Sequence, residues 1–259
     1  MLLRFLAIAC AAGFGPASAF AQSNPPVPGS QPPAVQPAKP ALTPEMRGDI
    51  YMARKMYREA IDTFREGPAK DPVLLNKIGI AYHQLTQLDN ARKNYEQAIR
   101  LKPDYVEALN NLGTVYYARK SYRRAISWYN RALKIAPEQP RAASIYMNLG
   151  TAYFARKRYD DANTAYIRAM ALDPEVFERH GNYGVMLEER SVEERAKFHF
   201  NLAKLYAKGG RNDLALQYLR KALEEGLHEK KKWNEEPEFA GLRDDPEFKK
   251  LLTIEPKVL

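Results

Sequence analysis

Small, aromatic and aliphatic side chains recur along the middle of this 259-residue chain in one fixed order. Counting from Gly113, an aromatic residue follows at +3, Ala at +12, an aromatic at +16, Ala at +19 and Pro at +24. Apolar positions three and four residues apart are typical of one face of an α-helix. Because a proline ends a helix, the frame predicts two consecutive short helices that stop before Pro137.

Three other glycines begin the same frame, which makes four copies. The copies start at Gly48, Gly79, Gly113 and Gly150, and their +24 prolines are Pro72, Pro103, Pro137 and Pro174. The segments NLGTVYYARKSY (111–122) and NLGTAYFARKRY (148–159) agree at nine of 12 positions. Glycine and alanine let two antiparallel helices approach closely, and the aromatic side chain at +16 fills the space beside them. Neither helix buries its apolar face alone, so the copies must stack on one another.

This frame resembles the tetratricopeptide repeat, a 34-residue helix-turn-helix unit. The spacing is 34 residues from Gly79 to Gly113, 37 from Gly113 to Gly150 and 31 from Gly48 to Gly79. The extra residues of the longer copy fall around Pro140, which indicates a longer turn. The resemblance implies an all-α fold, an α-solenoid with a C-terminal helical cap, and an activity that consists of binding.

After Pro174 two frames overlap. One starts at Gly184, 34 residues after Gly150, and another fits with Ala203 as its first position. We expect one helix over Phe177–Glu189 and another over Val192–Lys208, with Ser191 and Glu194 forming a capping box. The second of these helices would both pair with its predecessor and open the last repeat.

The C-terminal tail contains two similar segments, EPEFAGLR and DPEFKKLL. Each has an acid, then Pro, then Glu, which favours the start of a helix. The pattern predicts two short helices that dock apolar side chains on the last repeat, with Trp233 at the same junction. These side chains are Phe239, Leu242, Phe248, Leu251 and Leu252.

The N-terminal part differs from the rest. Arg4, an apolar stretch and Ala19-Phe20-Ala21 have the order of a secretory signal peptide cleaved after Ala21. The alternative is an uncleaved N-terminal anchor. Residues 22–42 are rich in proline and predict an extended tether. We therefore expect a signal peptide at 1–21, a linker at 22–42, a solenoid of five to six repeats at 43–226 and capping helices at 227–259.

Composition narrows the chemistry. Cys10 is the single cysteine and lies within the predicted signal peptide, which leaves no disulfide, thiol catalysis or cysteine–metal site. No two of the four histidines stand three or four residues apart, so no helical zinc motif is present. Glycine-rich nucleotide loops and a nucleophile elbow are also missing. We expect neither an enzyme nor a cofactor nor a metal site.

The net charge is +9. A basic balance can indicate nucleic acid, a membrane surface or acidic partners. Because an exported chain rarely meets nucleic acid, we expect none, and we expect no membrane span after signal cleavage. The basic turns at Arg119-Lys120 and Arg156-Lys157 are typical of a solvated surface, although stacking would align them into a ridge.

The resemblance implies a groove lined by the first helix of each repeat. Its candidate residues are Asn76, Lys77, His83, Asn111, Thr114, Tyr117, Asn148, Thr151, Phe154 and Asn182. Amides can hold the backbone of an extended peptide, and aromatic rings can hold its side chains. The asparagines could instead tie neighbouring helices together, whereas Tyr116 and Tyr153 are expected to serve packing.

The resulting hypothesis is an exported, periplasmic scaffold that binds a peptide segment or partner helix in this groove. The partner is a protein or peptide whose identity the sequence does not specify, and association with the cell envelope fits the predicted export. The alternative is a structural component of envelope or pilus assembly that acts through its outer or terminal surfaces.

Overall fold

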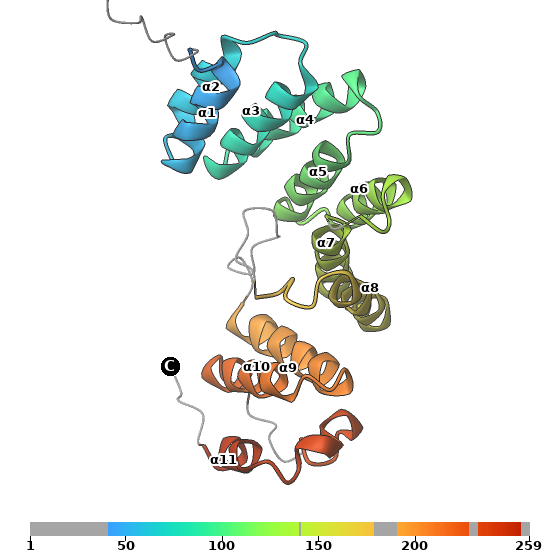
Figure 1. Cartoon of the computed structure of the whole chain (residues 1–259). Coiled ribbons are helices and arrows are strands. Elements are labelled where there is room, and N and C mark those ends of the chain that lie inside the picture. Colours follow the sequence, from blue (N-terminus) through green and yellow to red (C-terminus); the bar gives the residue numbers. More distant parts are fainter. Residues whose placement is uncertain (1–40, 140, 179–190, 228–232, 255–259) are drawn as a thin grey trace, which may run out of the picture. The chain divides into compact units, whose positions relative to one another are not determined.

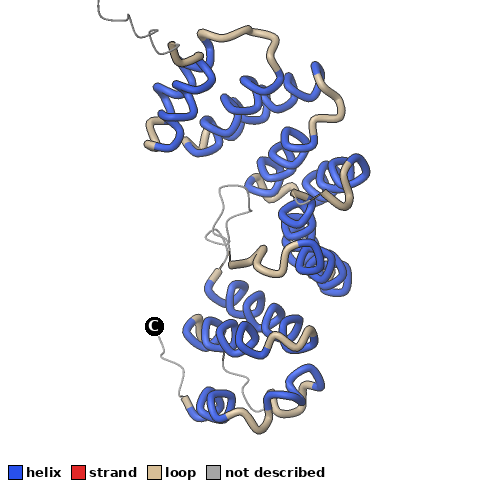
Figure 2. The backbone as a smooth tube through the Cα atoms, viewed as in Figure 1, coloured by secondary structure: helices blue, strands red, loops and turns tan. Residues whose placement is uncertain are grey.

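The computed structural model describes residues 41–139, 141–178, 191–227 and 233–254. The chain divides into two parts, Met1–Ala41 and Leu42–Leu259, and the described residues belong almost entirely to the second. All regular elements among them are helical (Figures 1 and 2). This confirms the predicted all-α class of stacked helix pairs.

Ten of the helices form five consecutive antiparallel pairs in the described part of the chain. The pairs are α1 (Pro44–Ala53) with α2 (Tyr57–Arg65), α3 (Pro72–Gln84) with α4 (Leu88–Leu101), α5 (Val106–Ala118) with α6 (Tyr122–Ile135), α7 (Ala142–Ala155) with α8 (Tyr159–Leu172), and α9 (Val192–Lys208) with α10 (Asn212–Glu224). Each first helix of pairs two to four also packs on the second helix of the pair before it.

The glycine of each frame lies against the +16 ring inside its own pair. A Cβ atom placed on Gly113 would lie 2.4 Å from a ring carbon of Tyr129. The corresponding separation is 2.5 Å for Gly79 and Tyr95, and 2.5 Å for Gly150 and Tyr166. Heavy atoms do not approach this closely without a shift of the structure, so the bare glycine backbone is what allows the ring to lie between the helices.

In the last pair, α9 and α10, different side chains occupy the glycine position and the +16 position. Ala203 of α9 stands in the glycine position, and the residue at +16 is Leu219 rather than an aromatic residue. Both side chains are fully buried in one apolar cluster. A methyl group is gained on one helix and a ring is lost on the other, so the packed volume is kept roughly constant.

Each first helix ends in the same way. The residue after its C-cap has a left-handed backbone, with φ of 59° at Lys55, 57° at Lys120 and 60° at Lys157. The amide of the following residue then donates to the carbonyl of the +3 tyrosine, for example Ser121 to Tyr116 at 2.8 Å. This is a Schellman-type end, and it turns the chain directly into the second helix.

The +24 prolines follow the ends of α4, α6 and α8, as the frame predicts. The first copy differs, because Pro72 is the first residue of α3 instead. This copy is three residues short, which moves its +24 position onto the start of the next helix. Asp71 caps that start, since its carboxylate accepts from the amides of Val73 and Leu74 at 2.7 and 3.3 Å.

Helix α9 has the predicted bounds and the predicted capping box of Ser191 and Glu194. It pairs with α10, so the structure realises the frame that starts at Ala203. Of the expected helix over Phe177–Glu189, only Phe177 and Glu178 are among the described residues, and they lie in a turn. Phe198 of α9 packs edge-on against Phe154 and Tyr166, with centroids 5.6 and 5.7 Å apart.

The tail forms two short helical segments at the predicted places, although they differ in type. Helix α11 (Pro246–Thr253) is capped by Asp245, whose carboxylate accepts two amides at 2.8 and 3.2 Å. The other segment, η3 (Pro237–Leu242), is a 3-10 helix without a side-chain cap. The Glu236 carboxylate instead lies 2.5 Å from the Lys204 ammonium of α9.

Both tail segments bury aromatic side chains on the last pair. Phe239, Phe248 and Trp233 are fully buried, and the indole stacks on Phe200 of α9 at 5.7 Å. Among the described helices none is long and apolar enough to cross a membrane. The boundaries of the signal peptide, linker, solenoid and cap remain predictions.

The glycine–ring contact generates a stability test. Gly113→Ala forces a Cβ atom into the Tyr129 ring, and overpacking of this kind costs about 1–3 kcal/mol. Gly241→Ala is the matched control, since a Cβ atom there meets nothing within 4 Å. Thermal and urea unfolding followed by circular dichroism should show a lower midpoint for Gly113→Ala alone. Equal midpoints for the two variants would contradict the close approach.

Candidate functional site

Nine of the ten predicted groove residues lie on three successive first helices. Helix α3 carries Asn76, Lys77 and His83. Helix α5 carries Asn111, Thr114 and Tyr117, and helix α7 carries Asn148, Thr151 and Phe154. The tenth, Asn182, lies outside the described residues. Helix α5 contacts both α3 and α7, so the three sets are neighbours.

Buried asparagines link these helices into one row. The Asn111 amide nitrogen donates to the Asn76 amide oxygen at 3.1 Å, and the Asn148 nitrogen donates to the Asn110 oxygen at 3.1 Å. A weaker contact of 3.5 Å joins Asn110 to Asn111 within α5. All four amides are buried, so each bond satisfies a polar group that water does not reach.

The asparagines of this row occupy fixed positions relative to the repeat glycines. The asparagine three residues before one repeat glycine bonds the asparagine two residues before the next. The pairs Asn76–Asn111 and Asn110–Asn148 both obey it. Asn110 was absent from the predicted set. The signal that could have found it is the coincidence of asparagine at these two offsets in successive copies. Met147 holds the first offset in the next copy.

The threonine hydroxyls are engaged with the backbone of their own helices. Thr114 donates to the Asn111 carbonyl at 2.7 Å, and Thr151 donates to the Met147 carbonyl at 2.8 Å. The Tyr166 hydroxyl lies 3.4 Å from the Thr151 hydroxyl. In this conformation both side chains therefore serve the first helices themselves.

The two predicted groove aromatics are buried. Tyr117 contacts Tyr122 with ring centroids 5.2 Å apart. Phe154 packs edge-on against Tyr159 at 5.2 Å and against Phe198 at 5.6 Å. Each ring therefore lies in an aromatic cluster near the end of its helix. Both rings were expected to line the groove, but in this structure they are buried.

Lys77 and His83 are the more accessible members of the set. The Lys77 ammonium lies 2.5 Å from the Asp49 carboxylate and 2.9 Å from that of Glu45, both on α1. Burial of the ammonium opposes its charge, but the hydrogen bonds to Asp49 and Glu45 outweigh it and raise the pKa of Lys77. His83 is partly buried, and burial lowers its pKa, which keeps the imidazole neutral at pH 7.

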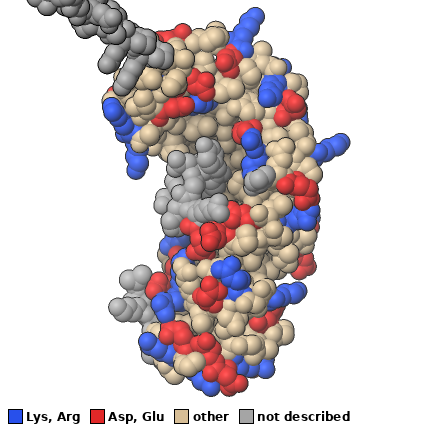
Figure 3. All heavy atoms as spheres, viewed as in Figure 1, with Lys and Arg blue, Asp and Glu red and all other residues tan. Residues whose placement is uncertain are grey.

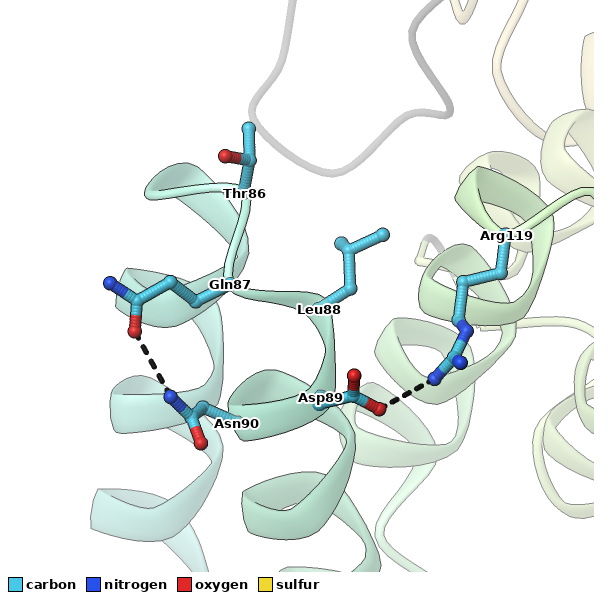
Figure 4. A pocket seen from close by; sticks show the side chains of 6 residues that line it. All are labelled: Thr86, Gln87, Leu88, Asp89, Asn90 and Arg119. Atoms are coloured by element: carbon cyan, nitrogen blue, oxygen red, sulfur yellow. Dashed lines mark hydrogen bonds and ion pairs between the residues drawn. The ribbon is translucent and has the colours of Figure 1, made fainter.

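A surface recess of about 410 Å³ lies at the turn between α3 and α4 (Figure 4). Its side chains are already paired, since Asp89 meets Arg119 at 2.7 Å and Gln87 meets Asn90 at 3.0 Å. No group of three or more His, Cys, Asp or Glu side chains in the described part of the chain is placed to hold a metal ion.

The amide row predicts coupled stability. Asn111→Ala leaves the Asn76 oxygen buried without this donor, at a cost of about 1–3 kcal/mol. Asn76→Ala removes the same bond from the other side. The double variant should therefore lose about 0.5–3 kcal/mol less than the sum of the two single losses, as measured by urea unfolding.

A control cycle combines Asn111→Ala with Asn163→Ala. Asn163 bonds Asn201 in a separate contact of 2.7 Å and shares no partner with Asn111. These two substitutions should be additive within about 0.5 kcal/mol. Additivity in both cycles would show that the amides do not depend on one another.

Comparison with known proteins agrees with this geometry. Tetratricopeptide repeat models match residues 71–138, 104–175 and 196–225, which cover helix pairs two to four and the last pair. Protein O-mannosyl-transferase Tmtc2 of Drosophila melanogaster is 38% identical over 93 residues, which are 35% of this chain and 10% of that protein. The uncharacterized protein ycf37 of Pyropia yezoensis is 39% identical over 62 residues, which are 24% of this chain and 35% of that protein.

Among solved structures, a crystal structure of MamA is 20% identical with a TM-score of 0.47. The match covers 69% of this chain and 93% of that one. The chain spans only a tenth of the fly protein and about a third of the algal one. The repeat frame, the five helix pairs and the matched family models together show that this chain belongs to the tetratricopeptide repeat family, whose stacked helix pairs act as scaffolds for protein–protein interaction.

Proposed function

We propose that the protein is an exported scaffold that binds a peptide segment or a partner helix along its first helices α3, α5 and α7. The observation that supports this most directly is the amide row, which brings Asn76, Asn110, Asn111 and Asn148 together across three repeats. Each amide has both a donor and an acceptor, as the backbone of an extended peptide has.

Burial of these amides sets a condition on binding. A partner reaches them only if neighbouring first helices separate locally and the amides exchange one partner for another. Repeat proteins allow such a motion, because each repeat contacts only its neighbours and can open without the whole chain unfolding. Binding along this face would then replace hydrogen bonds between asparagine side chains by hydrogen bonds to the peptide backbone, with little net loss of hydrogen bonding.

Site-specific photo-crosslinking tests which face is used. A benzophenone amino acid replaces His83, which is partly exposed on α3, and in a matched protein it replaces Lys250, which is exposed on α11. In intact cells we expect a crosslinked protein or peptide from the His83 position and none from the Lys250 position. Capture from Lys250 alone would contradict binding along the first helices.

Export is the second component of the proposal. It is supported by Arg4, the apolar stretch after it and the Ala19-Phe20-Ala21 sequence, followed by the proline-rich segment. N-terminal sequencing of the protein recovered from the periplasm or medium should begin at Gln22. Recovery from the membrane fraction with Met1 retained would instead support the uncleaved anchor.

One observation favours the alternative function, a structural role in assembly through a terminal surface. Helix α1 and the residue before its N-cap expose a short apolar stripe, with Leu42 at 46%, Met46 at 51% and Ile50 at 40% of full exposure. Met46 and Ile50 are four residues apart and lie on one face of α1. A stripe of this kind is suited to burial against another protein.

A further inference from the structure

Helix α6 lies within the longest basic stretch of the described repeats. The sequence contains no Asp or Glu between Glu107 and Glu138. The same stretch contains six basic residues, Arg119, Lys120, Arg123, Arg124, Arg131 and Lys134. On the face shown in Figure 3, acidic and basic side chains are interspersed. The question is whether contacts within the repeats account for all of this charge.

Three of the six cations have a partner within the repeats. Arg119 pairs with Asp89 of α4 at 2.7 Å. The Arg124 guanidinium lies over the Tyr116 ring at 5.6 Å. Arg131 donates to the Pro103 carbonyl at 3.2 Å and lies over the Trp128 ring at 5.3 Å. These side chains serve the packing of α6 on its neighbours.

The other three have neither an ion pair nor a hydrogen bond to any side chain in the described repeats. Lys120, Arg123 and Lys134 are exposed, and they occupy one side of α6 and of the turn before it. Ser127 and Asn130 lie between them and are also exposed. The spacing from 123 through 127 and 130 to 134 follows one helix face. All five side chains can donate hydrogen bonds outward.

The two arginines at the start of α6 oppose the local preference of the helix. The first turn of a helix favours acids and disfavours cations, because the unpaired amides there carry partial positive charge. The other second helices follow this preference, with Glu59 in α2, Asp89 in α4, Asp160 in α8 and Asp213 in α10. Helix α6 has no acid in its first turn and has Arg123 and Arg124 there. Departures from a local rule that nothing nearby compensates are typical of functional surfaces.

We propose that the outer face of α6 together with the turn before it, defined by Lys120, Arg123, Ser127, Asn130 and Lys134, docks an acidic segment of a protein partner. The argument is charge complementarity, since an unpaired cationic row attracts carboxylates and its hydroxyl and amide groups donate to the same oxygens. The choice of a protein rests on the proposed scaffold function. The row extends along about 20 Å of helix, which suits a partner helix with Glu or Asp at every third or fourth position.

A peptide-binding measurement on the full chain tests the proposal. The probe is a fluorescent Ala-rich helix with Glu at every third or fourth position, compared with the same peptide carrying Gln. The test variant is Lys120→Glu, Arg123→Glu and Lys134→Glu together. The matched control is Lys55→Glu, Lys70→Glu and Lys250→Glu, which changes net charge equally at exposed positions spread over three other places. Lys55 has the same left-handed turn backbone as Lys120, so any strain is matched.

We expect the Glu peptide to bind and the Gln peptide to bind more weakly, with affinity falling as salt rises. The α6 variant should lose about tenfold or more in affinity, as three exposed charge pairs would provide, while the control changes less than about twofold. A peptide with Lys in place of Glu should bind the α6 variant better than the wild type. Replacement of the same three residues by Gln, which disturbs folding less, should give a smaller loss.

Equal losses in both variants would overturn the proposal, because net charge alone would then explain binding. So would equal binding of the Glu and Gln peptides, or binding to anionic phospholipid vesicles without binding to the Glu peptide. The scaffold proposal is judged separately by crosslinking from His83. Capture there with no effect of the α6 variant would leave the scaffold in place and reject this docking surface.

Discussion

The structure depends on the contact between a glycine of one helix and an aromatic ring of the next. At Gly113 the Tyr129 ring occupies the place that a side chain would fill. This contact sets how closely the two helices of a pair approach, and thereby the surface on which the following pair packs. The same contact recurs at Gly48, Gly79 and Gly150, which is why one geometry is repeated along the chain. Where alanine replaces the glycine, Leu219 replaces the ring.

Buried amides add a directional element to this apolar packing. Apolar side chains tolerate small sliding movements between neighbouring helices, whereas a hydrogen bond between two side-chain amides is lost when the helices shift. The bond between Asn76 and Asn111 joins pairs two and three, and the bond between Asn110 and Asn148 joins pairs three and four. The row therefore stabilises the register of the repeats, and it contains the groups that we propose for peptide binding. These two roles compete, and this competition is the main physical constraint on binding along the first helices.

The Lys and Arg side chains of the repeats differ in whether they have an acidic partner. Several cations of the repeats meet a carboxylate, as Lys77 does on α1 and Arg119 does on α4. Helix α6 differs from the other second helices, because its stretch of sequence contains no acid between Glu107 and Glu138. Its outer face is accessible in the present conformation, whereas the asparagines of the first helices are buried. The two surfaces that we propose for partners therefore differ in accessibility: the first helices must open, whereas the outer face of α6 is already exposed.

The sequence alone determined the fold class and the helix pairs, because the frame of glycine, alanine, aromatic and proline specifies contacts inside one repeat. It also determined the capping box at Ser191 and the cap at Asp245, since caps depend on residues a few positions apart. The tertiary structure decided which of the predicted site side chains are buried against a neighbouring helix. Thr114 and Tyr117 have groove offsets, yet whether such side chains bind a ligand or each other depends on contacts between repeats. Local periodicity does not encode those contacts, because they join residues of different repeats, as in the bond from Asn111 to Asn76, which are 35 positions apart.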